Sequence, residues 1–188
     1  MLDDLPSSAA WRHVVAREGF EVVFVRVLRS GWRFDGHASA VEAGRPWTVR
    51  YEVTVDRHWC TRRAHVWLWS EARHCRRTLR SDGLGRWEVD GRHVAELNGC
   101  LDVDLEVSAF TNTFPVHRLA AHADPAHAVP AAYVRASELA VERLEQRYAR
   151  RAPGVYDYEA AAFDFACQLR YDTAGLVVEY PGIAVRVD

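Results

Sequence analysis

Lysine is absent from this 188-residue chain, in which 24 arginines stand against 26 acidic residues. Without lysine there is no Schiff-base nucleophile and no Gly-Lys-Ser/Thr motif of a phosphate-binding loop. The chain also has no Gly-x-Ser-x-Gly segment, so it lacks the nucleophile elbow of the α/β-hydrolases. These absences exclude several common enzyme classes.

Long apolar runs and closely spaced cysteines are absent as well. No segment approaches the ~20 apolar residues that a membrane-spanning helix needs. The start, MLDDLPSSAAW, lacks the apolar core of a secretory signal. The four cysteines are scattered, without a Cys-x-x-Cys pair: Cys60, Cys75, Cys100 and Cys167. We therefore expect free thiols, no transmembrane segment and a cytoplasmic protein.

A metal site has little support in the sequence. The nearest candidate set is His58, Cys60, His65, His74 and Cys75, in which His58 and Cys60 would share a strand face. Their spacing matches no standard zinc site, so we predict no metal and no cofactor.

Composition indicates an ordinary globular chain, with 49% hydrophobic and 27% charged residues. Its length suits one domain over residues 1–188. Arginine is dense at Arg62, Arg63, Arg73, Arg76, Arg77 and Arg80. These side chains could meet an anionic head group, but the net charge of -2 favours a solvated strand face, and we predict no nucleic-acid partner.

Strand patterns cover most of the chain. Apolar or alternating segments occupy 20–28, 32–41, 46–56, 62–70, 73–81 and 101–107. Asp82-Gly83 and Asp90-Gly91 are strong turn signals, and another hairpin would turn at Asp172–Gly175. The sequence therefore predicts an antiparallel meander that curls or closes.

Helical signals are few. The segment 111–121 predicts a short helix with Asn112 or Thr113 as N-cap and Pro115 in its first turn. Residues 137–151 have a helical composition, but their apolar residues fit neither a helix nor a strand period cleanly. The prolines of 122–131 predict a surface loop.

The segment 101–107 places Asp102 and Asp104 on one strand face. This face lies either in water or in a cleft that supplies cations or hydrogen-bond donors. Arg118 could return its guanidinium to the strand from the short helix and form a bidentate pair with an aspartate. We predict an ordered strand–turn–helix joint, with a polar binding site as the second interpretation.

Trp67 and Trp69 share a strand face, where two rings could stack on a sugar or line an acyl channel. Such a pair is more commonly part of a core. The other tryptophans considered are expected to be packing residues: Trp11, Trp32, Trp47 and Trp87.

Several motifs together resemble the bacterial putative glycolipid-binding family over about residues 11–187. They are the turn Asp82, Gly83, Gly85 and Trp87; the strand Gly99, Cys100, Asp102 and Asp104; the joint Thr111, Asn112, Thr113, Pro115 and Arg118; and Tyr180-Pro181-Gly182. The chain departs from the family pattern at Ala109-Phe110, Phe114 and His117.

The resemblance implies a mainly β fold, a spiral β-roll whose long antiparallel sheet wraps around a single helix, and usually a homodimer. It also implies a non-catalytic lipid or glycolipid ligand, by likeness in shape to bacterial lipoprotein carriers. The candidate ligand-binding residues are Asp102, Asp104, Thr111, Asn112, Thr113, Arg118, Trp67 and Trp69. The remaining motif residues are expected to be structural.

Two alternatives to a ligand binder stay open, a dimeric structural protein and a hydrolase. A cavity lined by Trp67, Trp69, Phe24 and Leu105 would favour the ligand binder. A buried Asp104–Arg118 pair without a cavity would favour a dimeric structural protein. A raised carboxylate pKa in an open pocket would favour a glycoside or ester hydrolase that uses Asp102 and Asp104, assisted by His117 or Arg118.

Overall fold

The computed structural model describes residues 2–15, 17–120 and 126–187. Within these ranges the one α-helix is α1 (Thr113–Leu119), which directly follows the 3-10 turn η2 (Phe110–Asn112). Two further 3-10 turns are η1 (Ala95–Leu97) and η3 (Ala161–Phe163). No helix in the described part of the chain is long and apolar enough to span a membrane.

Strands form two sheets. The large sheet has fourteen strands in the order β10-β13-β14-β15-β16-β17-β1-β2-β3-β4-β5-β6-β7-β8. Their bounds are β1 (Ser8–His13), β2 (Glu18–Leu28), β3 (Gly31–Glu42), β4 (Arg45–Asp56), β5 (Thr61–Ser70), β6 (His74–Ser81), β7 (Trp87–Val89), β8 (Arg92–His93), β10 (Ala126–Ala128), β13 (Arg147–Ala152), β14 (Val155–Ala160), β15 (Phe165–Tyr171), β16 (Val177–Tyr180) and β17 (Ala184–Val187). The small sheet contains β12 (Val141–Leu144), β11 (Ala131–Val134) and β9 (Asp102–Leu105).

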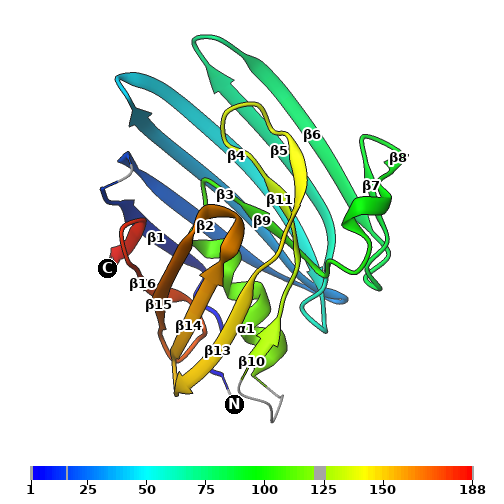
Figure 1. The fold of residues 1–188 in the computed structure, drawn as a ribbon, viewed down its shortest axis with the longest axis vertical. Helices are drawn as coiled ribbons and strands as arrows, with labels where there is room; N and C mark the ends of the chain where they lie inside the picture. The colour runs from blue at the N-terminus through cyan, green and yellow to red at the C-terminus, as the bar shows by residue number, and fades with distance from the viewer. Residues whose placement is uncertain (1, 16, 121–125, 188) are drawn as a thin grey trace.

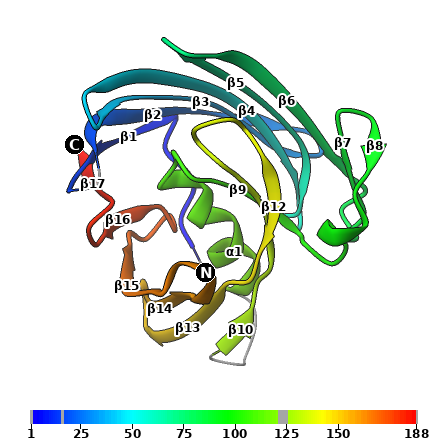
Figure 2. The same cartoon turned by 45° about the horizontal axis from the view of Figure 1, so that its top comes forward.

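The large sheet curls around α1 and the small sheet. β1 pairs with both β2 and β17, so the first and last strands of the large sheet's chain order lie side by side (Figure 2), although the two termini lie apart (Figure 1). α1 lies in the hollow of the curl, with β13–β16 on one side and β9 and β12 on the other (Figure 2). The predicted mainly β roll around a single helix is confirmed. The parallel pairing of β9 with β11 was not predicted.

Most predicted strands and turns are confirmed. Along β4, Val49, Tyr51, Val53 and Val55 are buried on the face that the alternation predicts. The Asp90-Gly91 turn joins β7 to β8, and the turn at 172–175 joins β15 to β16.

The segment 137–151, whose composition favours a helix but whose apolar residues fit neither period, contains strands and no helix. This segment forms β12 and β13, because Leu144, Gln146 and Tyr148 are buried at a spacing of two. In the proline-rich segment, residues 126–128 form β10, so the loop prediction is wrong there; residues 122–125 lie outside the described part of the chain.

Aromatic packing holds the helix inside the curl. Phe110 and Phe114 are fully buried, and their ring centroids lie 4.7 and 5.5 Å from that of Phe34 on β3. Trp11 on β1 lies 5.9 Å from Phe110. Burying one phenylalanine side chain contributes roughly 1.5–3 kcal/mol, so these contacts stabilise the joint of sheet and helix strongly.

A buried carboxylate fixes the start of the helical segment. Glu21 on β2 accepts hydrogen bonds from the Tyr51 hydroxyl at 2.5 Å, from the Ser108 hydroxyl, and from the amides of Ala109 at 2.8 Å and Phe110 at 3.4 Å. Burial raises the pKa of Glu21, while these four donors favour its ionised form. The large sheet therefore anchors η2 through one side chain.

Candidate functional site

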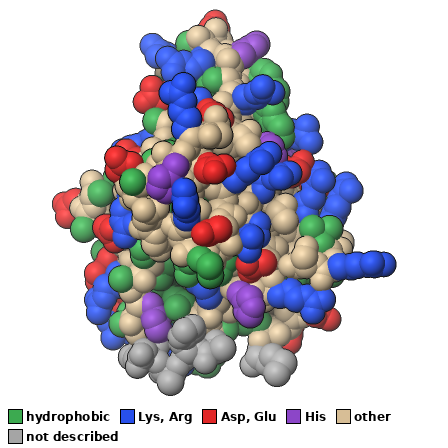
Figure 3. Space-filling model, turned by 90° about the vertical axis from the view of Figure 1, so that its right-hand side faces the viewer, with side chains coloured by type: hydrophobic (Ala, Val, Ile, Leu, Met, Phe, Trp, Pro, Cys, Tyr) green, Lys and Arg blue, Asp and Glu red, His purple; other side chains and the backbone are tan. Residues whose placement is uncertain are grey.

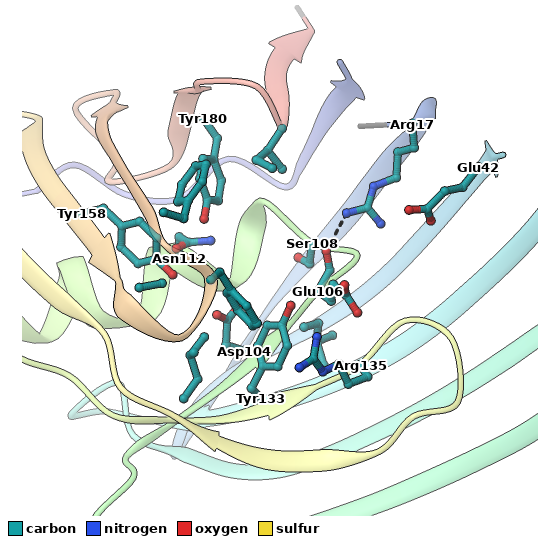
Figure 4. A pocket seen from close by; sticks show the side chains of 16 residues that line it. Arg17, Glu42, Asp104, Glu106, Ser108, Asn112, Tyr133, Arg135, Tyr158 and Tyr180 are labelled. Carbon is teal, nitrogen blue, oxygen red and sulfur yellow. Dashed lines mark hydrogen bonds between the residues drawn. The ribbon is translucent and has the colours of Figure 1, made fainter. Parts of the chain in front are cut away.

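A cavity of about 280 Å³ lies beside the joint of β9, η2 and α1 (Figure 4). Tyr158, Tyr180 and Asn112 lie toward one end of it, and Arg17 and Glu42 toward the other. Its further lining groups include Asp104, Glu106, Ser108, Tyr133 and Arg135, with apolar side chains between them. The cavity thus combines an apolar wall with a few convergent polar groups, as small-molecule sites do.

Asp104 is the centre of a buried hydrogen-bond chain along this cavity. Its carboxylate accepts bonds from the Thr111 hydroxyl at 2.8 Å and from Gln146 Nε2 at 2.5 Å. Gln146 Nε2 also donates to the Tyr158 hydroxyl at 3.0 Å, and the hydroxyls of Tyr158 and Tyr180 are hydrogen-bonded. Residues from β9, η2, β14 and β16 are thereby joined into one network.

Burial raises the pKa of Asp104 to about 6, against the opposing effect of its hydrogen bonds with Thr111 and Gln146. Each carboxylate oxygen accepts one of these bonds and can accept a second. Asp104 can therefore receive hydrogen bonds from a ligand that enters the cavity.

Arg118 pairs with Asp102, and the alternative pair Asp104–Arg118 is wrong. The guanidinium of Arg118 reaches both oxygens of Asp102, with Nη2 2.5 Å from Oδ2 and Nη1 bonded to Oδ1. Asp102 is 2% exposed. The solvent-facing interpretation of this strand is also wrong, because β9 lies in the small sheet inside the curl and all four of its residues are buried. The bidentate pair ties the last turn of α1 to β9.

Asn112 and Thr113 do not cap α1 through their side chains. Asn112 already has helical backbone angles, φ −66° and ψ −9°, because η2 runs directly into α1. Its Oδ1 instead accepts a hydrogen bond from the Tyr148 hydroxyl at 2.7 Å, and the residue lines the cavity. Thr113 is fully buried, and its hydroxyl has no hydrogen-bond partner among the described residues.

Trp67 and Trp69 lie away from both the core and the cavity. They point outward from β5, whereas Ala64, Val66 and Leu68 of the same strand face the core. Trp69 is 39% exposed, so the expectation that the pair belongs to the core is wrong.

The predicted cavity lining is correct at one position. Phe24 points outward from β2 and is 51% exposed. Of the four residues expected to line a cavity, Leu105 lines this one, whereas Trp67, Trp69 and Phe24 do not.

The turn motif and the start of the strand motif contact each other at one place, here called the clamp: Asp82, Gly83, Gly85, Trp87, Gly99 and Cys100. Asp82 accepts hydrogen bonds from the Leu84 and Arg86 amides, which fixes the turn around Gly83.

Two contacts then join this turn to the strand motif. The Gly99 amide donates to the Gly85 carbonyl at 2.8 Å, and the Trp87 indole donates to the Cys100 carbonyl at 2.7 Å. A Cβ on Gly85 would meet the backbone of Gly99 at 2.9 Å, so this approach requires glycine.

The remaining motif residues occupy different places. Pro115 is buried within the first turn of α1. Pro181 and Gly182 form the turn between β16 and β17, while Tyr180 lines the cavity. The sequence motifs thus build three places in the fold: the clamp, the joint beside the cavity, and the turn between β16 and β17.

No group of three or more histidine, cysteine or acidic side chains in the described ranges is placed to hold a metal ion. The alternative set of His58, Cys60, His65, His74 and Cys75 is accordingly not assembled.

Several cavity residues were missed by the sequence reasoning. Tyr133, Tyr158 and Phe163 line the cavity, and Gln146 binds Asp104 beside it, but none of the four is among the predicted site residues. The period of two over 144–148 could have placed Gln146 on a buried face, since its neighbours Glu145 and Arg147 are exposed.

Comparison with known proteins gives two matches. A family model described as putative glycolipid-binding matches residues 8–186. The crystal structure of a DUF1089 family protein from Pseudomonas aeruginosa is similar, with a TM-score of 0.79 and 30% sequence identity, over 100% of this chain and 96% of that one. No curated protein matches.

Replacing Arg118 with alanine leaves the Asp102 charge buried without its partner. We therefore expect the free energy of unfolding, measured in urea, to fall by ~3–5 kcal/mol. The double variant Arg118→Met/Asp102→Leu removes both charges and should recover most of that loss. Arg151→Ala breaks an exposed pair with Asp157 and should cost about 0–1 kcal/mol. An equal loss in the single and double variants would contradict a buried pair.

The raised pKa of Asp104 predicts a pH-dependent penalty. Between ~4, the value in the unfolded chain, and about 6, the folded protein keeps a proton that the unfolded chain has released. Stability from this group therefore falls as pH rises through that window.

Urea unfolding gives the free energy of unfolding of Asp104→Asn relative to that of the wild type. We expect this difference to rise by roughly 2–3 kcal/mol in favour of the variant as the pH increases from 4 to 7. Asp157→Asn is the matched control, since hydrogen bonds from Arg151 and Gln168 lower the pKa of that carboxyl. A flat difference between Asp104→Asn and wild type across this range would refute the assignment.

Proposed function

Because the chain belongs to the putative glycolipid-binding family, we propose that its cavity binds the sugar head group of a glycolipid. The observation that carries this proposal is the hydrogen-bond chain Thr111–Asp104–Gln146–Tyr158 along the cavity wall. A buried carboxylate held in this way is preorganised to accept bonds from sugar hydroxyls.

Aromatic side chains supply the complementary surface. Tyr133 and Phe163 both line the cavity, with ring centroids 5.4 Å apart. The apolar face of a sugar ring packs on such rings, while its hydroxyls turn to the polar groups. Arg17 and Arg135 lie at the cavity edge, where they can contact a polar substituent of the head group.

The size of the cavity favours the head group over the lipid tails. Its volume of about 280 Å³ is near the lower end of the ~300–1,000 Å³ typical of pockets for drug-sized ligands. One sugar ring with a short substituent suits this volume better than a pair of long acyl chains. The tails of the proposed ligand would then remain outside.

The candidate site residues divide into three roles under this proposal. Asp104 and Asn112 line the cavity, and Thr111 positions Asp104. Asp102, Arg118 and Thr113 stabilise the joint without lining the cavity, as a structural role would require. Trp67 and Trp69 take no part in this site.

One observation favours a hydrolase as a second candidate. Asp104 lies in an open cavity with a pKa near 6, which suits a general acid. The expected assistants are engaged elsewhere: Arg118 binds Asp102, and His117 stacks on Trp59 with a centroid distance of 3.7 Å. The description of the family also speaks of binding rather than of catalysis.

We further propose that the protein is cytoplasmic and forms a single domain over residues 1–188. All four cysteines are free, which supports a reducing compartment. The family match over 8–186 supports one domain.

We also propose a homodimer, as the family resemblance implies. On the outer face of β2, Phe20 and Phe24 are 50% and 51% exposed, which suits burial against a second copy. Light scattering should give twice the monomer mass for the wild type. The variant Phe20→Ser/Phe24→Ser should have the mass of one monomer. A monomeric wild type at all concentrations would exclude the dimer.

Calorimetric titration with short-chain alkyl glycosides tests the binding proposal, with an alkyl phosphocholine as a lipid that lacks sugar. We expect binding of at least one glycoside and a loss of about tenfold or more in Asp104→Asn, because bonds to a charged group contribute ~1.5–3 kcal/mol. Asp157→Asn should bind like the wild type.

No binding across the panel, or equal binding by Asp104→Asn, would overturn the proposal. Mass spectrometry of the same mixtures separates the two candidate functions. Cleavage of a glycoside that Asp104→Asn abolishes would favour the hydrolase.

A further inference from the structure

The outer face of β4, β5 and β6 carries four arginines and two tryptophans, here called the basic–aromatic face: Arg50, Arg63, Trp67, Trp69, Arg76 and Arg80. These side chains point away from the core, because residues that alternate with them along the same strands are buried: Val49, Tyr51, Ala64, Val66, Leu68 and Leu79. This face lies on the opposite side of the large sheet from α1 and has no part in the cavity.

Strand register brings these residues into adjacent rows. Arg50, Trp67 and Arg76 are direct neighbours across β4, β5 and β6. Arg63 stands opposite Arg80. Since neighbouring strands lie ~4.8 Å apart, each row forms a continuous surface. The Arg50 guanidinium carbon lies 4.9 Å from the Trp67 ring centroid, a cation–π contact.

The four arginines carry charge that no acidic side chain neutralises directly. None of the ion pairs found within the described ranges includes Arg50, Arg63, Arg76 or Arg80. Arginine side chains project along the right-hand edge of Figure 3, which views the molecule from the β6–β8 side.

The acidic groups nearest to these arginines are few. Glu52 is held by Arg33 at 2.8 Å, and Asp90 by Arg77 at 3.2 Å. Glu88 stands opposite Arg80 in the pairing of β6 with β7. The surplus of positive charge is therefore local, within a chain whose net charge is -2.

Exposed tryptophan beside unpaired arginine fits the chemistry of a bilayer surface. Tryptophan favours the head-group level of a membrane, and guanidinium groups bind phosphate through paired hydrogen bonds. A row of three side chains across a sheet presents these groups to a flat partner. A nucleic-acid duplex is less well matched, since no helix or ribbon projects from this face to enter a groove.

We propose that the basic–aromatic face docks on the surface of an anionic phospholipid bilayer. Arg50, Arg76 and their neighbours contact lipid phosphates, while Trp67 and Trp69 lie at the level of the head groups. This docking requires no glycolipid and is independent of the cavity.

Co-sedimentation with vesicles tests the proposal directly. Vesicles of phosphatidylcholine and phosphatidylglycerol in equal parts should bind the full chain, and vesicles of phosphatidylcholine alone should not. Binding should weaken with added salt, which screens the surface charges. Arg50→Ser/Arg76→Ser should weaken binding about twenty-five-fold, at about five-fold for each arginine.

The matched control is Arg147→Ser/Arg150→Ser, which removes the same charge from two exposed arginines of β13, far from β4–β6 in the strand order, and should bind like the wild type. Trp69→Ser should also weaken binding, and unchanged thermal unfolding of each variant shows that its fold is intact. Equal binding by both double variants, or equal binding to neutral vesicles, would overturn the proposal. Stronger binding to a DNA duplex, lost in Arg50→Ser/Arg76→Ser, would instead assign the face to nucleic acid.

Discussion

The buried carboxylates of the central segment, residues 102–119, need partners inside the protein, and this constraint organises the rest of the structure. The large sheet curls around residues 102–119, so their charges and hydroxyls are removed from water. Asp102 is satisfied by Arg118 within the joint. Glu21, on the surrounding sheet, accepts a hydrogen bond from the backbone amide of Ala109 at the start of the helical segment. The interior is thus fixed by specific polar contacts as well as by aromatic packing.

Asp104 differs from these groups because its partners leave part of its bonding capacity unused. Thr111 and Gln146 each supply one donor, and the remaining side of the carboxylate faces the cavity. Burial makes the charge costly, as the raised pKa shows. A fold that needed only stability would gain from an uncharged group at this position. The retained carboxylate therefore supports a binding role for the cavity.

Much of the fold could be predicted from the sequence, whereas little of the site could. Alternation and Asp-Gly turns act locally, so they identify strands such as β4 and the hairpin of β7 and β8 correctly. The pairing of Arg118 with Asp102 depends on the direction in which α1 leaves the joint, and no local pattern specifies it. Gln146, in the connection between β12 and β13, reaches Asp104 because the small sheet brings β12, β11 and β9 together, a long-range arrangement that a single sequence does not reveal.

The pairing of β1 with β17 has a consequence for synthesis on the ribosome. β1 leaves the exit tunnel well before β17, so one edge of β1 has no neighbour until β17 has been synthesised. An unpaired strand edge is a template for association with other chains. Nascent molecules would therefore depend on rapid synthesis, or on chaperones, during the interval before β17 pairs with β1.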